Sequence, residues 1–165
     1  MITYGLGTIE QIENAVAVGV KCGDANMYNA VPKRFLDENK SGKMKTFFAF
    51  DDGAVVGGVT LVVDDESSQT HWQKDLAGGS VANVCALRVK KENEGTGIAS
   101  GLMKFIEKWA GENGIKTLTI GVEPHIVRNI QIYFHWGFTE FIKVGQEQEN
   151  GKTVPVLYYK KTVNL

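Results

Sequence analysis

A chain of 165 residues, 43% hydrophobic and 22% charged, has the size and composition of one globular domain with one core. Its formal net charge of −1 argues against a nucleic acid or an anionic membrane surface as the partner. No apolar run reaches the ~18–20 residues of a membrane span, and the N-terminus lacks the basic and apolar regions of an export signal. The sequence therefore predicts a cytoplasmic domain that acts on a small molecule.

The first part of the chain predicts two helices, a hairpin and a long polar loop. The helices are expected at 8–20 and 31–40, the hairpin strands at 43–50 and 54–63, and the loop at 64–80. Thr8 and Gln11 form a capping box, and Pro32 stands near the first turn of the second helix. The turn at 51–53 reads Asp-Asp-Gly, which favours a hairpin between the flanking β-branched segments. The loop is long for a compact domain, and such loops are often functional or mobile.

The second part predicts a parallel crossover and a closing hairpin. Its strands are expected at 81–89, 116–122, 138–148 and 152–163, and its helices at 98–111 and 125–136. The strand–helix–strand order implies a right-handed parallel unit, and the Asn-Gly pair at 150–151 predicts the last turn. With an initial strand, the order βααββ–βαβ–αββ predicts an α/β (α+β) fold. We expect a mixed, mostly antiparallel central sheet of six to seven strands, with one parallel βαβ unit and about four helices.

Three glycines, Gly95, Gly97 and Gly101, follow the strand at 81–89 and introduce the next helix. Glycines at a helix N-terminus let a phosphate approach the unpaired N–H groups without a clash from Cβ. The same residues also fit a plain strand–helix turn in which Thr96 caps the helix. The glycines alone leave both interpretations open.

Two phosphate-binding motifs can be compared with this turn. The triphosphate loop G-x-x-x-x-G-K-[ST] does not occur in the chain. Residues 95–100 approach the dinucleotide motif G-x-G-x-x-G, with Glu123 as a carboxylate for the ribose. That fold requires consecutive parallel βαβ units, whereas this sequence offers one. Dinucleotide binding is therefore kept only as an alternative.

Two segments resemble the motifs of a known family. Residues 94–99, Glu-Gly-Thr-Gly-Ile-Ala, resemble the acetyl-CoA motif [Q/R]-x-x-G-x-[G/A] of the GNAT superfamily of N-acetyltransferases. Residues 132–141, IYFHWGFTEF, resemble the second hallmark of that family, an aliphatic residue and Tyr followed by Gly-Phe. The resemblance extends from about Ser80 to Phe141, where the order of elements and the separation of the motifs also agree. It implies that residues 1–165 form a single N-acetyltransferase domain with acetyl-CoA as cosubstrate.

The resemblance implies a role for each part of the motif. The strand at 81–89 would splay from the strand at 116–122 at a bulge, and the pantetheine arm would pair with backbone in the gap. The pyrophosphate would lie against the N–H groups of residues 95–100. The implied cofactor-binding residues are Leu87, Val89, Glu94, Gly95, Thr96, Gly97, Ile98, Ala99 and Ser100. An amine would attack the thioester directly, and Tyr133 would protonate the departing thiolate, since a tyrosine with a pKa of ~10 is protonated at neutral pH.

Two positions depart from the family pattern. Glu94 replaces the usual Gln or Arg and would repel a diphosphate unless it faces solvent or a nearby cation such as Lys90 or Arg128 offsets it. Ile126 stands where the family commonly has Asn, and Asn129 lies one helical turn further on. The role of that asparagine is therefore not transferred.

The acceptor side has weaker signals. Glu123, at the end of the strand at 116–122, could serve as the base for the amine or simply as a surface or capping carboxylate. Asn83 and Cys85 share a strand face that either lines the acceptor pocket or packs in the core. Asp24 and Tyr28 are further candidate substrate-binding residues. Neither the histidines nor the cysteines have metal-ligand spacing, so no metal site is predicted.

The predicted function is transfer of the acetyl group of acetyl-CoA to a primary amine of a small molecule or peptide, in a ternary complex. One alternative is a non-catalytic domain that senses acyl-CoA, and another is a dinucleotide-binding oxidoreductase. Tyr133→Phe separates the enzyme from the sensor, and NADH binding would support the oxidoreductase. Members of the family are often dimers, so the resemblance also implies a possible homodimer.

Overall fold

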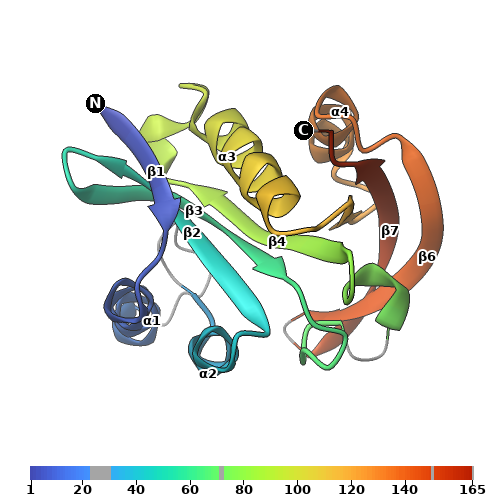
Figure 1. The fold of residues 1–165 in the computed structure, drawn as a ribbon, viewed down its shortest axis with the longest axis horizontal. Coiled ribbons are helices and arrows are strands. Elements are labelled where there is room, and N and C mark those ends of the chain that lie inside the picture. Colours follow the sequence, from blue (N-terminus) through green and yellow to red (C-terminus); the bar gives the residue numbers. More distant parts are fainter. Residues whose placement is uncertain (23–30, 71–72, 150, 165) are drawn as a thin grey trace.

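The computed structural model describes residues 1–22, 31–70, 73–149 and 151–164, and Figure 1 shows their arrangement. The strands are β1 (Ile2–Leu6), β2 (Met44–Asp51), β3 (Ala54–Val62), β4 (Val81–Val89), β5 (Thr117–Val122), β6 (Glu140–Glu149) and β7 (Lys152–Thr162). The α-helices are α1 (Ile9–Cys22), α2 (Lys33–Ser41), α3 (Ile98–Glu112) and α4 (Val127–His135), and two 3₁₀ turns are η1 (Lys74–Leu76) and η2 (Lys91–Asn93).

The described strands form one sheet in the order β1-β2-β3-β4-β5-β7-β6. The pair β4·β5 is parallel, and the other five pairs are antiparallel. The predicted mixed sheet with one central βαβ unit is therefore confirmed. The consecutive parallel units that a dinucleotide-binding fold requires do not occur among the described strands.

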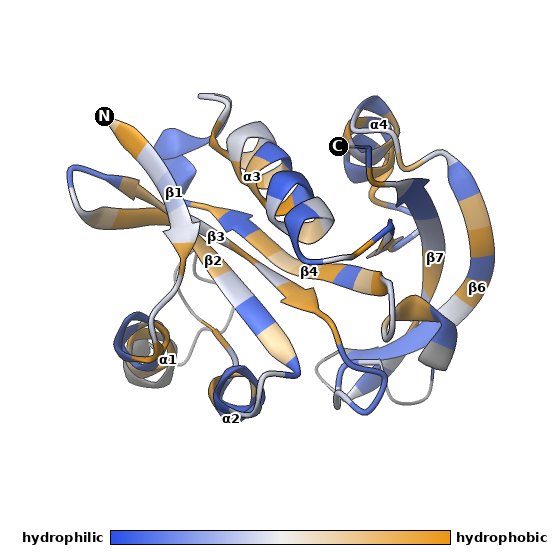
Figure 2. Ribbon diagram, in the orientation of Figure 1, coloured by the Kyte–Doolittle hydropathy of each residue, from blue (hydrophilic) through white to orange (hydrophobic). Residues whose placement is uncertain are grey.

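Helices cover both faces of this sheet. Figure 1 shows α3 and α4 on one face and α1 and α2 on the other. The largest apolar cluster lies between the sheet and α3, where Phe47, Leu102, Ile106 and Leu118 are completely buried. Figure 2 shows β3 as apolar along most of its length, as expected for a strand covered on both faces. The site is built on the middle strands of this covered sheet.

The helix starts can be traced to local chemistry. The backbone N–H of Thr8 donates to Gln11 Oε1 at 2.9 Å, and the N–H of Gln11 donates to Thr8 Oγ1 at 3.2 Å. This reciprocal pair is the predicted capping box. Pro32 lies just before α2 rather than in its first turn, because its ψ of 138° is extended.

The loop expected at 64–80 is packed more tightly than its polar composition suggests. Its described residues include the 3₁₀ turn η1, and Ser67, Thr70, Gln73 and Leu76 are buried. Glu38 of α2 accepts hydrogen bonds from the Ser67 hydroxyl and, at 2.8 Å, from the Ser68 N–H. These bonds give the Ser67 hydroxyl and the Ser68 N–H a protein partner in place of water, and they tie the loop to α2.

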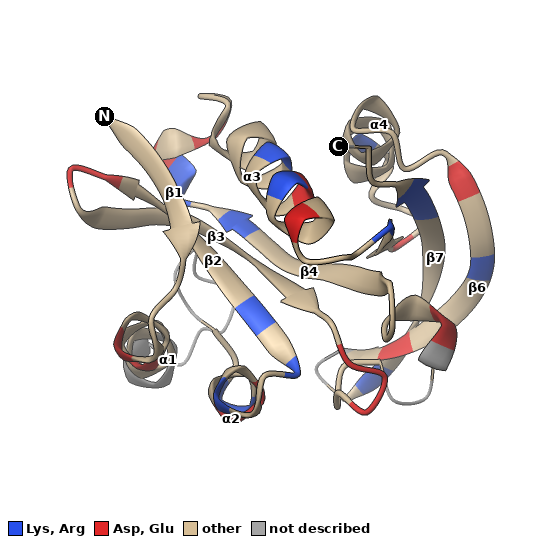
Figure 3. Cartoon of the chain, in the orientation of Figure 1, with Lys and Arg blue, Asp and Glu red and all other residues tan. Residues whose placement is uncertain are grey.

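The surface carries charges of both signs. Figure 3 shows Lys and Arg interspersed with Asp and Glu, including along α3 and β6. Among the described residues, no helix is both long and apolar enough to cross a membrane.

Candidate functional site

Strand β4 loses its pairing with β5 at its middle and keeps its pairing with β3. It pairs with β5 from Val81 to Val84, and the last pair is Val84 with Ile120. Its pairing with β3 continues to Val89, but the register shifts, and Ala86 has a φ of +51°. An extra residue with positive φ marks a β-bulge, which bends the strand and ends pairing on one side. The predicted splay of β4 from β5 is therefore confirmed, and it opens the sheet beside residues 87–89.

The glycine turn follows directly after β4. Gly95 and Gly97 have φ values of 76° and 87°, in the left-handed region that favours glycine. Gly97 is the N-cap of α3, and the first intrahelical bond runs from the Gly101 N–H to the Gly97 carbonyl at 2.9 Å. The N–H groups of residues 98–100 therefore have no partner within the helix. They provide the donors and the positive helix end expected for an anion cradle.

Two expectations for this turn are wrong. Thr96 does not cap α3, because its hydroxyl donates to the Asn93 carbonyl at 2.6 Å and Gly97 occupies the N-cap. Gly101 does not belong to the cradle, because a Cβ there would lie 1.9 Å from the Tyr4 hydroxyl of β1. The third glycine therefore lets α3 approach the sheet.

A cleft of about 550 Å³ lies over the bulge and the turn. This α3–α4 cleft is lined by residues from 87–89, 93–100 and 128–136. Of the nine predicted cofactor-binding residues, Thr96 is the one that does not line it. Glu94 lines the cleft and is exposed, and Arg128 lines the cleft from α4. The Nζ atom of Lys90 lies 2.5 Å from Glu92 Oε1, so Lys90 is already paired with another carboxylate. Arg128 is therefore better placed than Lys90 to offset Glu94.

Helix α4 closes the other side of the cleft through Tyr133 and Trp136. The two rings are stacked, with centroids 5.9 Å apart. Trp136 Nε1 donates to the Ser100 hydroxyl at 3.2 Å, which connects α4 to the first turn of α3. Burial raises the pKa of the Tyr133 hydroxyl above its ordinary value, so the group stays protonated at neutral pH.

A second cavity, of about 300 Å³, lies where β4 and β5 part. This β4–β5 cavity is lined by Pro32, Arg34, Phe35, Gln69, Asn83, Val84, Cys85, Ala86, Leu87, Arg88, Ile120, Gly121, Tyr133 and Glu147. Leu87, Arg88 and Tyr133 also line the α3–α4 cleft. Tyr133 therefore stands at the junction of the two spaces.

The structure brings two of the predicted acceptor residues, Asn83 and Cys85, into the β4–β5 cavity. Asn83 Nδ2 donates to Thr119 Oγ1 at 2.9 Å, so part of its amide is used to join β4 to β5. Burial raises the pKa of the Cys85 thiol to about 12, so this group is not a thiolate nucleophile at neutral pH.

The other predicted acceptor residues are not in this cavity. Asp24 and Tyr28 lie outside the described residues. Glu123 follows β5, where its carboxylate lies 3.4 Å from His125 Nδ1, and it lines neither the cleft nor the cavity. Arg34, Arg88 and Glu147 line the cavity but are absent from the predicted site. The sequence did single out Arg88, because it is a charged residue in a mostly apolar strand. Nothing in the sequence distinguishes Glu147 from the polar residues around it.

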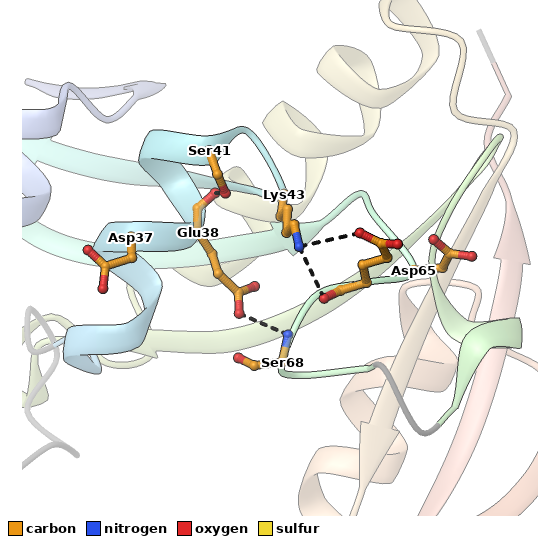
Figure 4. A pocket seen from close by; sticks show the side chains of 7 residues that line it. Asp37, Glu38, Ser41, Lys43, Asp65 and Ser68 are labelled. Carbon is orange, nitrogen blue, oxygen red and sulfur yellow. Dashed lines mark hydrogen bonds and ion pairs between the residues drawn. The ribbon is translucent and has the colours of Figure 1, made fainter.

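A third hollow, of about 720 Å³, lies at the surface beside α2 and is shown in Figure 4. Its carboxylates include Glu38, which is bonded to the loop at Ser67 and Ser68, and Glu66, whose carboxylate lies 3.6 Å from Lys43 Nζ. These contacts secure the loop, and the hollow shares no lining residue with the cleft or the cavity. Within the described part of the chain, no group of three His, Cys, Asp or Glu residues could hold a metal ion.

Comparison with known proteins agrees with this geometry. The model of the acetyltransferase (GNAT) family matches residues 20–138. No curated protein sequence gives a significant match.

Solved structures share the fold at low sequence identity. Arabidopsis thaliana NAA60 in complex with a bisubstrate analogue has a TM-score of 0.70 at 16% identity, over 99% of this chain and 100% of that one. Ribosomal-protein-alanine N-acetyltransferase from Brucella melitensis has a TM-score of 0.68 at 17% identity, over 97% and 99% of the two chains. The IAA acetyltransferase from Bacillus cereus has a TM-score of 0.66 at 15% identity, over 98% and 99%. The family match spans more than half of the sequence, and the chain therefore belongs to the GNAT acetyltransferase family.

Proposed function

We propose that this protein transfers the acetyl group of acetyl-CoA directly to a primary amine of a small molecule or peptide. The observation that carries the proposal is the position of Tyr133 at the junction of the α3–α4 cleft and the β4–β5 cavity. A thioester held in the cleft would meet an amine held in the cavity beside a single phenol. A pure acyl-CoA sensor has no need of the second cavity.

The cleft has the chemistry that acetyl-CoA requires. The N–H groups of residues 98–100 would receive the pyrophosphate, with Arg128 as the nearby cation. The backbone of Leu87 and Val89, beyond the last pairing with β5, would bond the pantetheine amides. Glu94 is exposed, so its carboxylate can face solvent instead of the pyrophosphate.

The reaction begins with loss of a proton from the ammonium group of the acceptor. The nitrogen lone pair then attacks the thioester carbonyl, the C–N bond forms, and the C–S bond breaks. Tyr133 gives its proton to the departing thiolate, and the proton released by the new amide nitrogen restores the phenol. The remaining proton goes to solvent, so the products are an N-acetyl amine and the free thiol. Glu123, the candidate base from the sequence, lines neither space and would need a water relay to reach the cavity.

The first experiment is calorimetric titration of the protein with acetyl-CoA, with NADH as the control ligand. We expect binding of acetyl-CoA alone. Release of free thiol is then measured with a panel of primary amines. Absence of acetyl-CoA binding would refute the proposed function, and binding without turnover of any amine would favour the sensor.

Tyr133→Phe tests the assigned acid. Loss of the hydroxyl is expected to lower kcat by about 10²–10⁴-fold, the usual range for general acid catalysis, while the Kd for acetyl-CoA stays within a factor of two or so of wild type. Phe134→Leu, on the same helix and outside both spaces, is the matched control. Unchanged turnover in Tyr133→Phe would remove Tyr133 from the mechanism.

The single-domain organisation, the cytoplasmic location and the homodimer stay predictions.

A further inference from the structure

Glu147 of β6 is the one carboxylate among the described residues that line the β4–β5 cavity. It reaches the cavity although β6 is the edge strand, two positions from β5 in the sheet. The strand β7 lies between them, and its Tyr158 bridges the gap. The residues that hold Glu147 therefore come from separate parts of the chain.

A chain of hydrogen bonds sets the position of this carboxylate. Gln73 Nε2 donates to the Tyr158 hydroxyl at 2.9 Å, and the Tyr158 hydroxyl donates to Glu147 Oε1 at 2.7 Å. Tyr158 is 2% exposed, and burial raises its pKa far above the ordinary value, so the hydroxyl remains a donor. The hydroxyl thus accepts from Gln73 and donates to Glu147, and because its ring is fixed by packing, the bond holds the carboxylate in one place.

Two glycines make room for the Tyr158 ring. A Cβ at Gly121 of β5 would lie 2.7 Å from Cε1 of the ring, and a Cβ at Gly145 of β6 would lie 2.6 Å from Cε2. The Cβ at Gly145 would also lie 2.5 Å from Gln73 Oε1. Any other residue at these two positions would displace the ring or the glutamine. Both strands that flank β7 thus accommodate the path from Gln73 to Glu147.

The charges around Glu147 define what the cavity can accept. Arg34 of α2 and Arg88 of β4 line the same space, and Arg34 Nη2 donates to Gln69 Oε1 at 2.7 Å. Asp75, which does not line the cavity, lies 2.5 Å from Lys143 Nζ and is neutralised by it. A cavity lined by one carboxylate and two guanidinium groups would hold one ammonium group, repel a second cation and attract an anionic group.

We propose that Glu147 binds the protonated amine of the acceptor and takes its first proton, with Tyr158 and Gln73 as positioning residues. The inference rests on the proposed acetyl transfer. In this step one N–H bond of the ammonium group breaks, the proton moves to the carboxylate, and the freed lone pair attacks the thioester. The proton then leaves Glu147 for solvent. The acceptor class is a small amine with one positive charge and an anionic group, such as an amino acid.

The acceptor class is tested on the wild-type protein with matched probes. For chains of two to six carbons, kcat/KM is compared among the simple amine, the same chain with a terminal carboxylate, and the same chain with a second amine. The α-amino acids are compared with their carboxamides. We expect the carboxylate-bearing probes to exceed the diamines by at least about tenfold, the effect of one charged hydrogen bond. Diamines as the best substrates, or no acetylation of any carboxylate-bearing probe, would overturn the acceptor class.

The role of Glu147 is tested with the best probe from this panel. Glu147→Gln is expected to lower kcat/KM by about a hundredfold or more with unchanged acetyl-CoA affinity. Glu140→Gln, exposed on the same strand, is the matched control and should keep wild-type activity. Glu123→Gln is measured in parallel. Wild-type kcat/KM in Glu147→Gln, or a large loss in Glu123→Gln alone, would overturn the assignment.

Tyr158→Phe tests the positioning residue without removing its ring. The ring still fits between Gly121 and Gly145, so we expect a small change in Tm, an increased KM for the amine and an unchanged Kd for acetyl-CoA. An equal loss of acetyl-CoA and amine binding would indicate a merely structural role. Failure of acetyl-CoA to bind the wild-type protein would refute the proposed function instead, so the two failures are distinguishable.

Discussion

Gly101 offers the sharpest test of the packing between α3 and the sheet. A Cβ at this position would lie 1.9 Å from the Tyr4 hydroxyl and 2.3 Å from Tyr4 Cζ, both far inside van der Waals contact. Overpacking of this kind costs about 1–3 kcal/mol, whereas replacing Gly by Ala inside a helix stabilises it by about 1 kcal/mol. The balance predicts that Gly101→Ala lowers the free energy of unfolding by about 1 kcal/mol.

The same substitution should have the opposite sign when Tyr4 is truncated. In a Tyr4→Ala background the clash disappears, and Gly101→Ala is expected to stabilise the protein by about 1 kcal/mol through helix propensity alone. The four proteins of this cycle are compared by urea unfolding, and the coupling between the two sites should be about 2 kcal/mol. Tyr4→Ala itself destabilises, because the ring packs near Phe105, with centroids 6.3 Å apart.

The reasoning would be refuted by additive effects. If Gly101→Ala changed stability equally in both backgrounds, to within about 0.5 kcal/mol, Tyr4 would not be the reason for this glycine. Acetyl-CoA affinity is the second measurement. A glycine that serves packing can be replaced with little change in Kd, whereas one that contacts the pyrophosphate cannot.

The remaining predictions concern single positions. Thr8→Ala is expected to lower the free energy of unfolding by about 1 kcal/mol, and Thr8→Ser by much less, because serine keeps the bond to the Gln11 N–H; equal losses would contradict the capping box. Gly97→Ala is expected to cost about 1–2 kcal/mol because its φ is 87°, and Gly97→Asn less, since asparagine tolerates left-handed backbone. Burial raises the pKa of Cys85 from 9.0 to about 12, so its alkylation at pH 8, followed by peptide mass spectrometry, should be roughly a thousandfold slower in the folded protein than in urea. Comparable alkylation rates in the two states would contradict the raised pKa. Because the folded thiol stays protonated where the unfolded thiol ionises, this group also lowers the free energy of unfolding as the pH rises from 9.0 towards 12.

Local features of this protein were predictable because neighbouring residues decide them. The capping box needs Thr8 and Gln11 one turn apart, and the left-handed turn needs glycine at 95 and 97. Each is a condition on a few consecutive residues, and so are the β-branched segments around Asp-Asp-Gly that mark the first hairpin. The order of these elements was sufficient for the mixed sheet with one parallel pair.

The relation between distant segments was decided by the tertiary structure. Ala86 has a positive φ without being glycine, so only the family resemblance pointed to the bulge, and the pairing of β4 with both neighbours located it. In the sequence Gly101 could not be told apart from Gly95 and Gly97 as part of the phosphate turn. The structure shows that it is a glycine because of its contact with Tyr4, 97 residues earlier in the chain. Glu147 lines the cavity, and its carboxylate is held by hydrogen bonds that run from Gln73 through the Tyr158 hydroxyl. Such contacts depend on strand order and register, which bring residues together regardless of their separation in sequence.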